Sequence, residues 1–567
     1  MSNQLTFEFN ERPSIKGFPE LRWTGKRPYR STQYFPAQLR ESYGEERSGW
    51  INKIFWGDNL QVMSHLMKEF RGAVDLIYID PPFDSKADYK KKIALRGQTV
   101  ASDSSSFEEK QYGDIWTNDE YLQFMYERLI LMRELLSDIG SIILHCDWHK
   151  SHHLRCLMDE IFSPDYFRNE IAWCYGGGGA PKNEYPNKHD MLLWYTKSGR
   201  WTFNKQYRPY SEGTLQRGLT AVKGESYKLD DEGAMLNDWW SEKEVQKILS
   251  PTAYENLKYP TQKPEGLLKR IILGHSNPGD LVFDCFMGSG TTQAVAMKLG
   301  RHFIGADINL GAIQTTTKRL ITLADELATD ESEPIKHTGF EVYNVNNYEF
   351  FRNPIEARDL LIDALEIQPF PQSGVWDGEL DGRMVKIMPV NRIATKADLE
   401  ELKANLPYKT YEKRKEEEPT RPVEKITIIC MGHEADLKAS LEQELMEYKL
   451  DIQIVDILRD KSDLQLKRDA EADIAIEGGR LVVRVFYPLN LMQKLSLQKE
   501  FVEDWRQLVD SIMIDWNYDG AIMHPTVMDV PGKKEMVRGI YDVPANAGTI
   551  KVKITDVLSE SLEMEVR

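Results

Sequence analysis

The sequence has little cysteine, no long hydrophobic run and no excess of basic charge, and each absence excludes a class of protein. Five cysteines among 567 residues are too few for a disulfide scaffold. No apolar run approaches the roughly 20 residues that cross a bilayer. The first residues, Met1–Gln4, do not begin a basic segment followed by an apolar core, as a signal peptide would. These features predict a cytoplasmic protein with no membrane partner.

The formal net charge of -17 argues against a uniformly basic nucleic-acid-binding surface. Net charge describes the whole surface, however, whereas DNA binding depends on local patches. A DNA-binding function would therefore require a basic groove on an otherwise acidic protein. The length of 567 residues exceeds one ordinary core, so we expect two or three domains.

One stretch, Leu76–Phe83, runs from apolar residues directly into an acid and two prolines. Four apolar residues without alternation predict a strand buried on both faces, as in a parallel sheet. Pro81 and Pro82 end the strand because neither has an N–H to donate. Asp80 and Phe83 are therefore expected just beyond the carboxyl end of a core strand, where open α/β sheets bind ligands. Taken alone, a plain strand end with a solvated Asp80 explains the stretch equally well.

A second motif, Leu281–Thr292, predicts a strand, a turn with two glycines and the start of a helix. Gly288 and Gly290 allow a tight turn and a close approach of the backbone to a ligand. The next short strand, Phe303–Asp307, ends on an acid at roughly the spacing of the ribose-binding acid in dinucleotide folds. A solvated strand end is the alternative for Asp307, but the four features together favour a nucleotide-like ligand.

The two motifs resemble those of the amino-group DNA methyltransferases. Asp80–Phe83 is similar to their catalytic motif, and Asp284–Thr292 is similar to their F-x-G-x-G motif for S-adenosyl-L-methionine. The catalytic motif comes first, as in the circularly permuted group called β, and Tyr259–Pro264 resembles that group's Q-K-P segment. The chain is also similar to the modification subunits of type III restriction-modification systems. The resemblance covers about residues 50–325 and implies an α/β, Rossmann-like methyltransferase domain, with a mostly parallel sheet and helices on both faces.

The resemblance implies methyl transfer to the N6 amino group of adenine in double-stranded DNA, after the base has left the stack. Asp80 and the carbonyl of Pro81 would accept the two N–H bonds of the amine, and Pro82 and Phe83 complete the catalytic motif, with the Phe83 ring stacking on the base. N4-cytosine enzymes usually have serine in place of Asp80, so adenine is favoured and N4-cytosine is the alternative. Methylation at cytosine C5 would need a cysteine after a proline, and none of the five cysteines follows one.

The resemblance also implies a set of contacts to the cofactor. Asp58 and Asn59 would lie near its methionine end, unless they only cap the helix that follows. Asp307 would bind the ribose, and Lys263 would support the carboxylate end. The other expected cofactor contacts belong to the glycine turn and its flanks: Asp284, Phe286, Gly288, Ser289, Gly290 and Thr291.

Composition and the resemblance together divide the chain into segments. Residues 1–48 are polar and rich in proline and arginine, which predicts an irregular arm, either a disordered tail or an arm that contacts DNA or a partner. The methyltransferase domain is expected at 49–335 and a connecting α/β region at 336–412. A charged linker at 413–424 would lead to a C-terminal α/β plus β-rich domain at 425–567, for which docking or dimerisation is the hypothesis.

Three parts are expected within the methyltransferase domain: a catalytic half at 49–200, a target-recognition region at about 176–255 and a cofactor half at 256–335. The polar stretch 84–115 predicts a long loop whose lysines contact DNA phosphates. Residues 201–254 are aromatic and basic, as suits the reading of base edges. The alternative for them is an ordinary surface insertion.

The sequence leaves the partners other than DNA open. A homodimer and a restriction, helicase or nuclease subunit are the candidates, as for the modification component of a restriction-modification or phage-defence system. A hypothesis from another class is a DNA-recognition or scaffold subunit of a defence complex, with the methylase core serving recognition. The run His145–His153 mixes imidazole, thiol and carboxylate groups, but it lacks the second spaced ligand pair of a zinc site, so we expect no metal.

Overall fold

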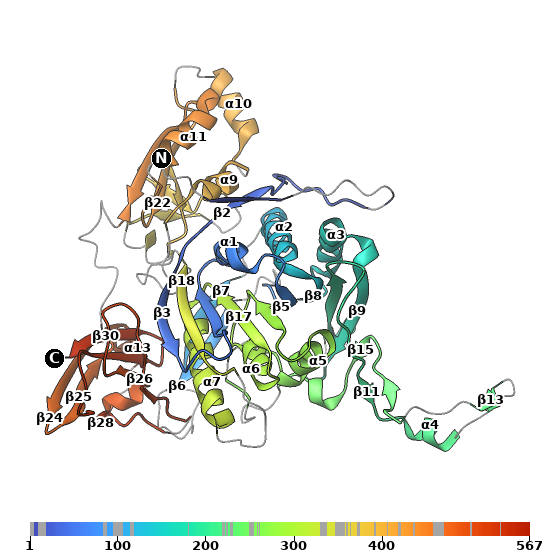
Figure 1. The fold of residues 1–567 in the computed structure, drawn as a ribbon. Helices are drawn as coiled ribbons and strands as arrows, with labels where there is room; N and C mark the ends of the chain where they lie inside the picture. The colour runs from blue at the N-terminus through green and yellow to red at the C-terminus, as the bar shows by residue number, and fades with distance from the viewer. Residues whose placement is uncertain are drawn as a thin grey trace.

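The structure is a computed structural model of the chain (Figure 1). It describes residues 5–566 except for 10–16, 18, 83–87, 95–105, 114–117, 178, 180, 218–220, 223–224, 227–230, 249–254, 258, 260, 329–336, 346–357, 359–360, 363–364, 371–374, 391–392, 405, 418–420, 435–436, 458–469, 499–501 and 533–534. Within these residues, no helix is both long and apolar enough to span a bilayer.

A ten-stranded sheet forms the centre of the molecule (Figure 1). Its strands, in spatial order, are β15 (Trp239–Trp240), β9 (Phe167–Cys174), β10 (His189–Thr196), β8 (Leu136–Cys146), β5 (Val74–Ile79), β16 (Leu281–Asp284), β17 (His302–Asp307), β4 (Asn52–Trp56), β18 (Phe340–Val345) and β3 (Ala37–Tyr43). The run from β8 to β18 is parallel throughout, whereas β10 and β3 pair antiparallel with their neighbours. The expected mostly parallel, Rossmann-like sheet is confirmed.

Helices cover both faces of this sheet, because its central strands are apolar on both sides. One core joins the sheet to α1–α3, and the other joins it to α5–α7. The bounds of these helices are α1 (Asn59–Phe70), α2 (Asn118–Leu135), α3 (Ser151–Phe162), α5 (Glu265–His275), α6 (Thr291–Lys298) and α7 (Leu310–Ala328).

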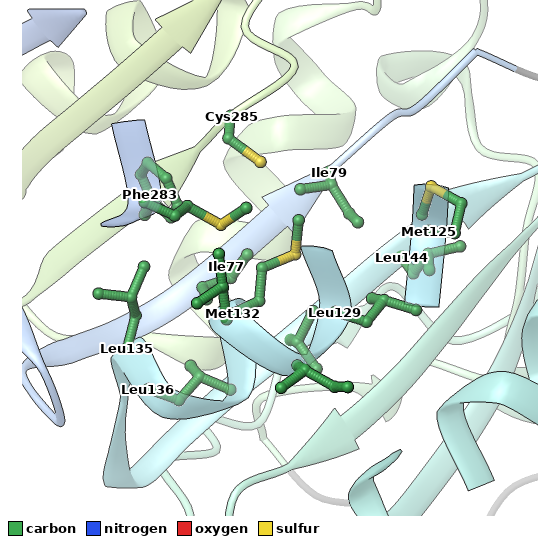
Figure 2. Close-up of a cluster of buried hydrophobic side chains, with 14 of the residues drawn as sticks. Ile77, Ile79, Met125, Leu129, Met132, Leu135, Leu136, Leu144, Phe283 and Cys285 are labelled. Atoms are coloured by element: carbon green, nitrogen blue, oxygen red, sulfur yellow. The ribbon is translucent and has the colours of Figure 1, made fainter. Parts of the chain in front are cut away.

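Strand β5 lies at the centre of the sheet and is buried on both faces, as its sequence predicts. Ile77 and Ile79 point into the core with α2, and Leu76 and Tyr78 belong to the opposite core. Figure 2 shows Ile77 and Ile79 packed among methionine and leucine side chains of α2 and beside Phe283 of β16. Because β5 and β16 are parallel neighbours, the turns that follow them meet at the same edge of the sheet.

The sheet extends beyond the predicted domain bounds of 49–335 at both ends. β3 lies in the segment predicted to be an irregular arm, and β18 lies in the predicted connecting region. They pair with each other, and β18 also pairs with β4. The arm prediction is therefore wrong for 37–43, and two further short strands, β1 (Thr6–Glu8) and β2 (Ser31–Gln33), pair within the same segment.

The C-terminal unit docks on the outer strand of the ten-stranded sheet. The Ser42 N–H donates to the Met523 carbonyl at 3.0 Å, and the Met523 N–H donates to the Arg40 carbonyl at 3.0 Å. Lys553 pairs with the buried Glu41. Figure 1 shows this unit beside β3 and β18. Its strands are β24 (Glu471–Glu477), β25 (Arg480–Tyr487), β26 (Val509–Asp515), β27 (Val527–Asp529), β28 (Ile540–Asp542), β29 (Ile550–Asp556) and β30 (Ser561–Val566), and its helix is α13 (Leu489–Gln498).

A separate five-stranded sheet crosses the boundary that we expected between 336–412 and 425–567. It joins β21 directly to β22 in parallel, so both predicted segments contribute to one unit. The predicted linker at 413–424 is partly wrong as well, because α10 continues to Glu417. The buried ring of Tyr411 anchors this helix to the unit. The elements of this unit are β19 (Gln368–Pro369), β20 (Gly378–Leu380), β21 (Arg383–Ile387), β22 (Lys425–Cys430), β23 (Asp451–Asp456), α9 (Lys396–Ala404), α10 (Tyr408–Glu417) and α11 (Leu437–Glu444).

Short hairpins occupy the two stretches expected to contact DNA. The predicted loop at 84–115 contains an antiparallel pair, β6 (Asp88–Ala94) with β7 (Ser106–Gly113), so the loop prediction is wrong for these strands. The predicted recognition region adds β15 to the edge of the large sheet. The same region also contains β10 of the large sheet, so 189–196 belong to the sheet and not to a separate recognition insert. Its other described elements are β11 (Tyr207–Arg208), α4 (Glu212–Arg217), β12 (Ala221–Val222), β13 (Glu225–Ser226), β14 (Ala234–Met235) and a 3-10 turn at Lys243–Val245.

Candidate active site

A cavity of about 320 Å³ opens where the turns after β5 and β16 meet, and we call it the central cavity. This volume is within the usual range of small-molecule sites. Its walls come from six stretches of the chain, between residues 58 and 309. The lining residues are Asp58, Asn59, Tyr78, Asp80, Pro82, Phe124, Tyr259, Thr261, Gln262, Lys263, Leu268, Asp284, Cys285, Phe286, Met287, Gly288, Ser289, Thr291, Thr292, Asp307, Ile308 and Asn309.

Asp80 enters the central cavity from the end of β5 and is flanked by two basic side chains. Its Oδ2 forms a short ion pair with Nζ of Lys263. Its Oδ1 is buried, lies 3.9 Å from Nδ1 of His145 and has no hydrogen-bond partner among the described residues. The structure thus places Lys263 against the carboxylate of Asp80, whereas the sequence led us to expect it beside a cofactor.

The glycine turn has the backbone geometry that the sequence predicts. Gly288 has φ of +53° and Gly290 has φ of +70°. Residues other than glycine adopt this left-handed backbone conformation only with strain. At Gly290 there is also no room for a side chain, because an added Cβ would lie 2.5 Å from Cγ2 of Thr316. From α7, Arg319 donates to the carbonyl of Ser289 at 3.1 Å and to Oγ1 of Thr291 at 3.0 Å, which ties the turn to that helix.

Two carboxylates, the buried Asp284 and the partly exposed Asp307, hold the ends of β16 and β17 on either side of this turn. Asp284 accepts from the Phe286 N–H at 3.0 Å and from Oγ1 of Thr292 at 2.6 Å. Asp307 accepts from the Gly288 N–H at 2.8 Å. Burial raises the pKa of Asp284 to about 7 and that of Asp307 to about 6. Each carboxylate has lone pairs left over for a ligand, since an ionised carboxylate offers about four acceptor positions.

Asp58 and Asn59 enter the central cavity from the start of α1. Asp58 caps this helix by accepting from the Leu60 N–H at 2.9 Å, so the capping role that we weighed against a ligand contact is present. Asp58 also lines the cavity, and Arg128 of α2 binds one of its oxygens at 3.0 Å. The guanidinium of Arg128 stacks on Phe124, 3.5 Å from the ring centroid, and so fixes that wall.

The structure brings together most of the predicted site residues, but not all of them. Pro81 and Gly290 are not among the residues that line the central cavity, and Phe83 lies outside the described residues. Sequence reasoning missed Tyr78, Phe124, Arg128 and Tyr259 as wall or clamp residues, together with Gln262 of the same segment as Lys263. The sequence could have indicated Arg128, because it is a lone basic residue on the apolar side of a predicted helix.

The segment His145–His153 does not gather its polar groups around one point. His145 is fully buried in β8, whereas His149 is partly exposed and binds Asp147 at 2.6 Å. Trp148 stacks on His149 with ring centroids 3.7 Å apart. Within the described part of the chain, no group of three or more His, Cys, Asp or Glu side chains is arranged to hold a metal ion.

Comparison with known proteins gives consistent matches over about half of the chain. The sequence model of a family described as DNA methylase matches residues 74–318. The Type II methyltransferase M.EcaI of Enterobacter cloacae is 30% identical over 333 residues, which cover 47% of this chain and 69% of that protein. The DNA adenine methyltransferase YhdJ of Escherichia coli (strain K12) is 28% identical over 286 residues, which cover 50% of this chain and 87% of that protein. The solved M1.HpyAVI-SAM complex is 21% identical and has a TM-score of 0.31, covering 47% of this chain and 98% of that one.

Proposed function

The chain belongs to the DNA methyltransferases of the N6-adenine and N4-cytosine type, and from that premise we propose that it methylates the N6 amino group of adenine in double-stranded DNA. The observation that carries the proposal is the central cavity, which both Asp80 and the glycine turn line although they are about two hundred residues apart. One wall offers a hydrogen-bond acceptor to an amine, and the other offers a backbone turn to a nucleotide-like ligand.

The cofactor of this family is S-adenosyl-L-methionine, which supplies an electrophilic methyl group when bound. The walls of the central cavity suit it in charge. Among the described lining residues, the carboxyl groups Asp58, Asp80, Asp284 and Asp307 outnumber the basic side chains, which suits a positively charged methyl donor. Asp307 at the end of β17 would hold the ribose hydroxyls, and Phe286 and Ser289 would line the turn beside them.

The chain itself would act by binding, orienting and accepting hydrogen bonds. The amine of adenine is a poor nucleophile because its lone pair is delocalised into the ring. Asp80 and the carbonyl of Pro81 would draw the two N–H bonds out of the ring plane and so localise that lone pair. The base must leave the helix first, and positioning and electrostatics then supply most of the rate.

Adenine is favoured over cytosine by two observations. Asp80 occupies the position where N4-cytosine enzymes usually have serine, and one relative is named as a DNA adenine methyltransferase. The similarity to the Type II methyltransferase M.EcaI supports a further proposal. The chain would be the modification component of a restriction-modification or phage-defence system. The hairpin β6–β7 and the region from β11 to β15 would contact the DNA, and the C-terminal unit would hold a second copy or a restriction, helicase or nuclease subunit.

Transfer of a labelled methyl group tests this function. Purified protein is incubated with methyl-labelled S-adenosylmethionine and amplified genomic DNA, which carries no methylation, and the digested nucleosides are separated by mass. We expect label in N6-methyldeoxyadenosine. A duplex of only guanine and cytosine should accept no label. Label in N4-methyldeoxycytidine alone would reject adenine as the target, and no transfer by folded protein would favour the scaffold subunit.

The affinity for S-adenosylmethionine should fall as the pH drops through about 6. The pKa of Asp307 is raised to about 6 by burial, so the carboxylate is ionised above this pH and neutral below it. The ionised form accepts hydroxyl hydrogen bonds more strongly, so the dissociation constant should rise by up to about tenfold for each pH unit below the pKa. Titration calorimetry between pH 5 and 8 would measure it.

An Asp307→Asn variant should lose this pH dependence and bind about tenfold more weakly at pH 8, since a charge-assisted hydrogen bond contributes about 1.5–3 kcal/mol. Asp325→Asn, on the exposed side of α7, serves as the matched control and should behave as the wild type. An unchanged pH profile in Asp307→Asn would remove Asp307 from the ribose site.

A further inference from the structure

A buried histidine lies directly behind the proposed catalytic carboxylate. His145 is fully buried in β8, and its Nδ1 is 3.9 Å from Oδ1 of Asp80. That oxygen is itself buried and has no hydrogen-bond partner among the described residues. A buried acceptor without a hydrogen bond beside a titratable ring calls for an explanation. The mechanism proposed above gives no role to His145 and no role to a proton on Asp80.

The ring of His145 is fixed from both sides. Its Nε2 lies 3.3 Å from Oδ2 of Asp190 on β10, and its Nδ1 lies 2.9 Å from the hydroxyl of Tyr78 on β5. Burial acts to raise the pKa of Asp190, but the hydrogen bond from His145 and the charges of nearby basic groups, Lys247 and Lys263 among them, outweigh it and lower that pKa to about 2. Since Asp190 is therefore ionised, Nε2 carries a proton and donates it, which leaves Nδ1 as the acceptor of the Tyr78 hydroxyl.

Charged groups face this ring from every neighbouring element. Asp80 and Asp190 are the two anions, and each has a cation behind it. Lys263 pairs with Asp80. Lys247 lies 3.4 Å from the ring centroid of Tyr175, whose hydroxyl donates to Asp190 at 2.9 Å. The ring of His145 thus lies between two carboxylates, one facing each of its nitrogens.

We propose that His145 is a positioning residue that takes up, through Asp80, the proton released by the methylated amine. This inference rests on the proposed function. In the transfer, the N6 lone pair forms the new N–C bond, and the S–C bonding pair stays on sulfur. The nitrogen is then cationic, and one N–H bond breaks with its pair returning to nitrogen while the proton goes to the carboxylate of Asp80.

The second step moves that proton from Asp80 to His145. The lone pair of Nδ1 forms the new N–H bond, and Asp80 becomes a carboxylate again. The hydroxyl of Tyr78 turns to leave Nδ1 accessible, and the gap of 3.9 Å closes to hydrogen-bond length. The imidazolium is then stabilised by Asp190. When the base leaves, the proton returns through Asp80 to water that enters the central cavity.

Lys263 is the reason for a second acceptor. Lys263 pairs with Asp80, so a proton that stayed on this carboxylate would break the ion pair. A free imidazole binds a proton roughly 10²-fold more tightly than a free carboxylate. Passing the proton to His145 therefore restores Asp80 as an acceptor for the next amine.

The test is the pH profile of single-turnover methyl transfer to amplified genomic DNA, at saturating S-adenosylmethionine and with enzyme in excess. In the wild type, the rate should fall about tenfold per pH unit below the point where His145 is already protonated. His145→Asn, which keeps a polar group but cannot take the proton, should be about 10- to 100-fold slower at pH 8 and lack this acidic limb. An unchanged rate or an unchanged limb would overturn the proposal.

Two further variants should move the limb in opposite directions. Asp190→Asn removes the anion that stabilises the imidazolium, so the limb should move to lower pH. Tyr78→Phe removes the hydrogen bond to the neutral ring, so the limb should move to higher pH. Shifts in the same direction, or no shifts, would contradict the relay even if His145→Asn failed to fold.

His149→Asn is the matched control, because His149 lies four residues away in the same segment and binds only Asp147 among the contacts that the structure shows for its ring nitrogens. Its rate and pH profile should equal those of the wild type. Thermal melting and cofactor binding of each variant would detect a merely structural role, which would lower stability without moving the limb. Absence of transfer by the wild type at any pH would reject the proposed function itself, whereas normal transfer with an unmoved limb would reject only the role of His145.

Discussion

Replacing Asp80 with asparagine should lower the rate of methyl transfer by about 10³-fold, since positioned acid–base groups contribute about 10²–10⁴. Asparagine has nearly the same shape, but its amide offers one acceptor and presents a donor to an amine that needs acceptors. Binding of S-adenosylmethionine should change by less than about threefold, because the glycine turn and Asp307 are untouched. Single-turnover transfer and calorimetry would measure the two quantities separately.

The Asp80 variant needs a control for the ion pair that it breaks. Lys263 is largely buried, with 12% of its side chain exposed, and loses its partner in this variant. Removing one partner of a buried pair costs about 3–5 kcal/mol of stability, so thermal melting must show that the protein is folded at the assay temperature. Asp138→Asn, an exposed acid at the opposite end of β8, should leave transfer unchanged. Residual activity above about a tenth of the wild type would exclude Asp80 from its role.

Replacing Gly290 with alanine should lower the free energy of unfolding by about 2–5 kcal/mol and weaken cofactor binding at least tenfold. The left-handed conformation costs an alanine about 1–2 kcal/mol, and the overlap with Thr316 adds about 1–3 kcal/mol. The clash falls on the side chain of Thr316 in α7, whose Oγ1 donates to the Gly288 carbonyl at 3.2 Å, so the turn or this side chain must shift before the new methyl group fits. Urea denaturation and cofactor titration would report the two effects.

A Gly300→Ala variant separates the cost of the left-handed backbone conformation from the cost of steric overlap. Gly300 has φ of +67°, close to the value of Gly290, but an added Cβ would meet no atom within 4 Å. This variant should lose only the conformational part of the stability and bind the cofactor normally. Equal losses in both variants would show that Thr316 moves aside freely and that the turn is not closely packed.

The parts of the site that could be predicted are those in which a few adjacent residues decide the structure. The apolar run of β5 ends at two prolines, and Gly288 and Gly290 adopt the positive φ that their turn needs. Such features depend on local sterics, so they can be read from any sequence. The resemblance to a family then supplied what local physics could not, namely that the two turns share one cavity.

The parts that could not be predicted depend on partners far away in the chain. Lys263 was expected near the cofactor from the family's Q-K-P segment, and nothing in that segment indicates its ion pair with Asp80, which is 183 residues away. Glu41 is buried in β3 because Lys553 and the hydroxyl of Tyr43 satisfy it. A polar segment with such a glutamate resembles an irregular arm until its distant partner is known.

A high density of charged residues also led to a wrong prediction, because it is typical of linkers and of exposed helices alike. The segment from Lys413 onward has the composition of a linker, yet its first residues, up to Glu417, belong to α10. The pair of Lys413 and Glu417 lies one helical turn apart at 3.8 Å, and the single buried ring of Tyr411 anchors the helix. One apolar anchor in ten residues gives too weak a periodicity to recognise.

Because Met523 binds the backbone of β3, the methyltransferase core cannot be cut out of the chain without losing contacts to the C-terminal unit. The region matched by the family, 74–318, includes neither β3 nor the residues that cover it. A protein trimmed to that region would also lack β4 and β18, and it would expose the N–H and C=O groups of β17 along one side, where β4 now pairs with them. An open ladder of this kind recruits strands from other chains, so the flanking units protect the catalytic sheet from self-association as well as extending it.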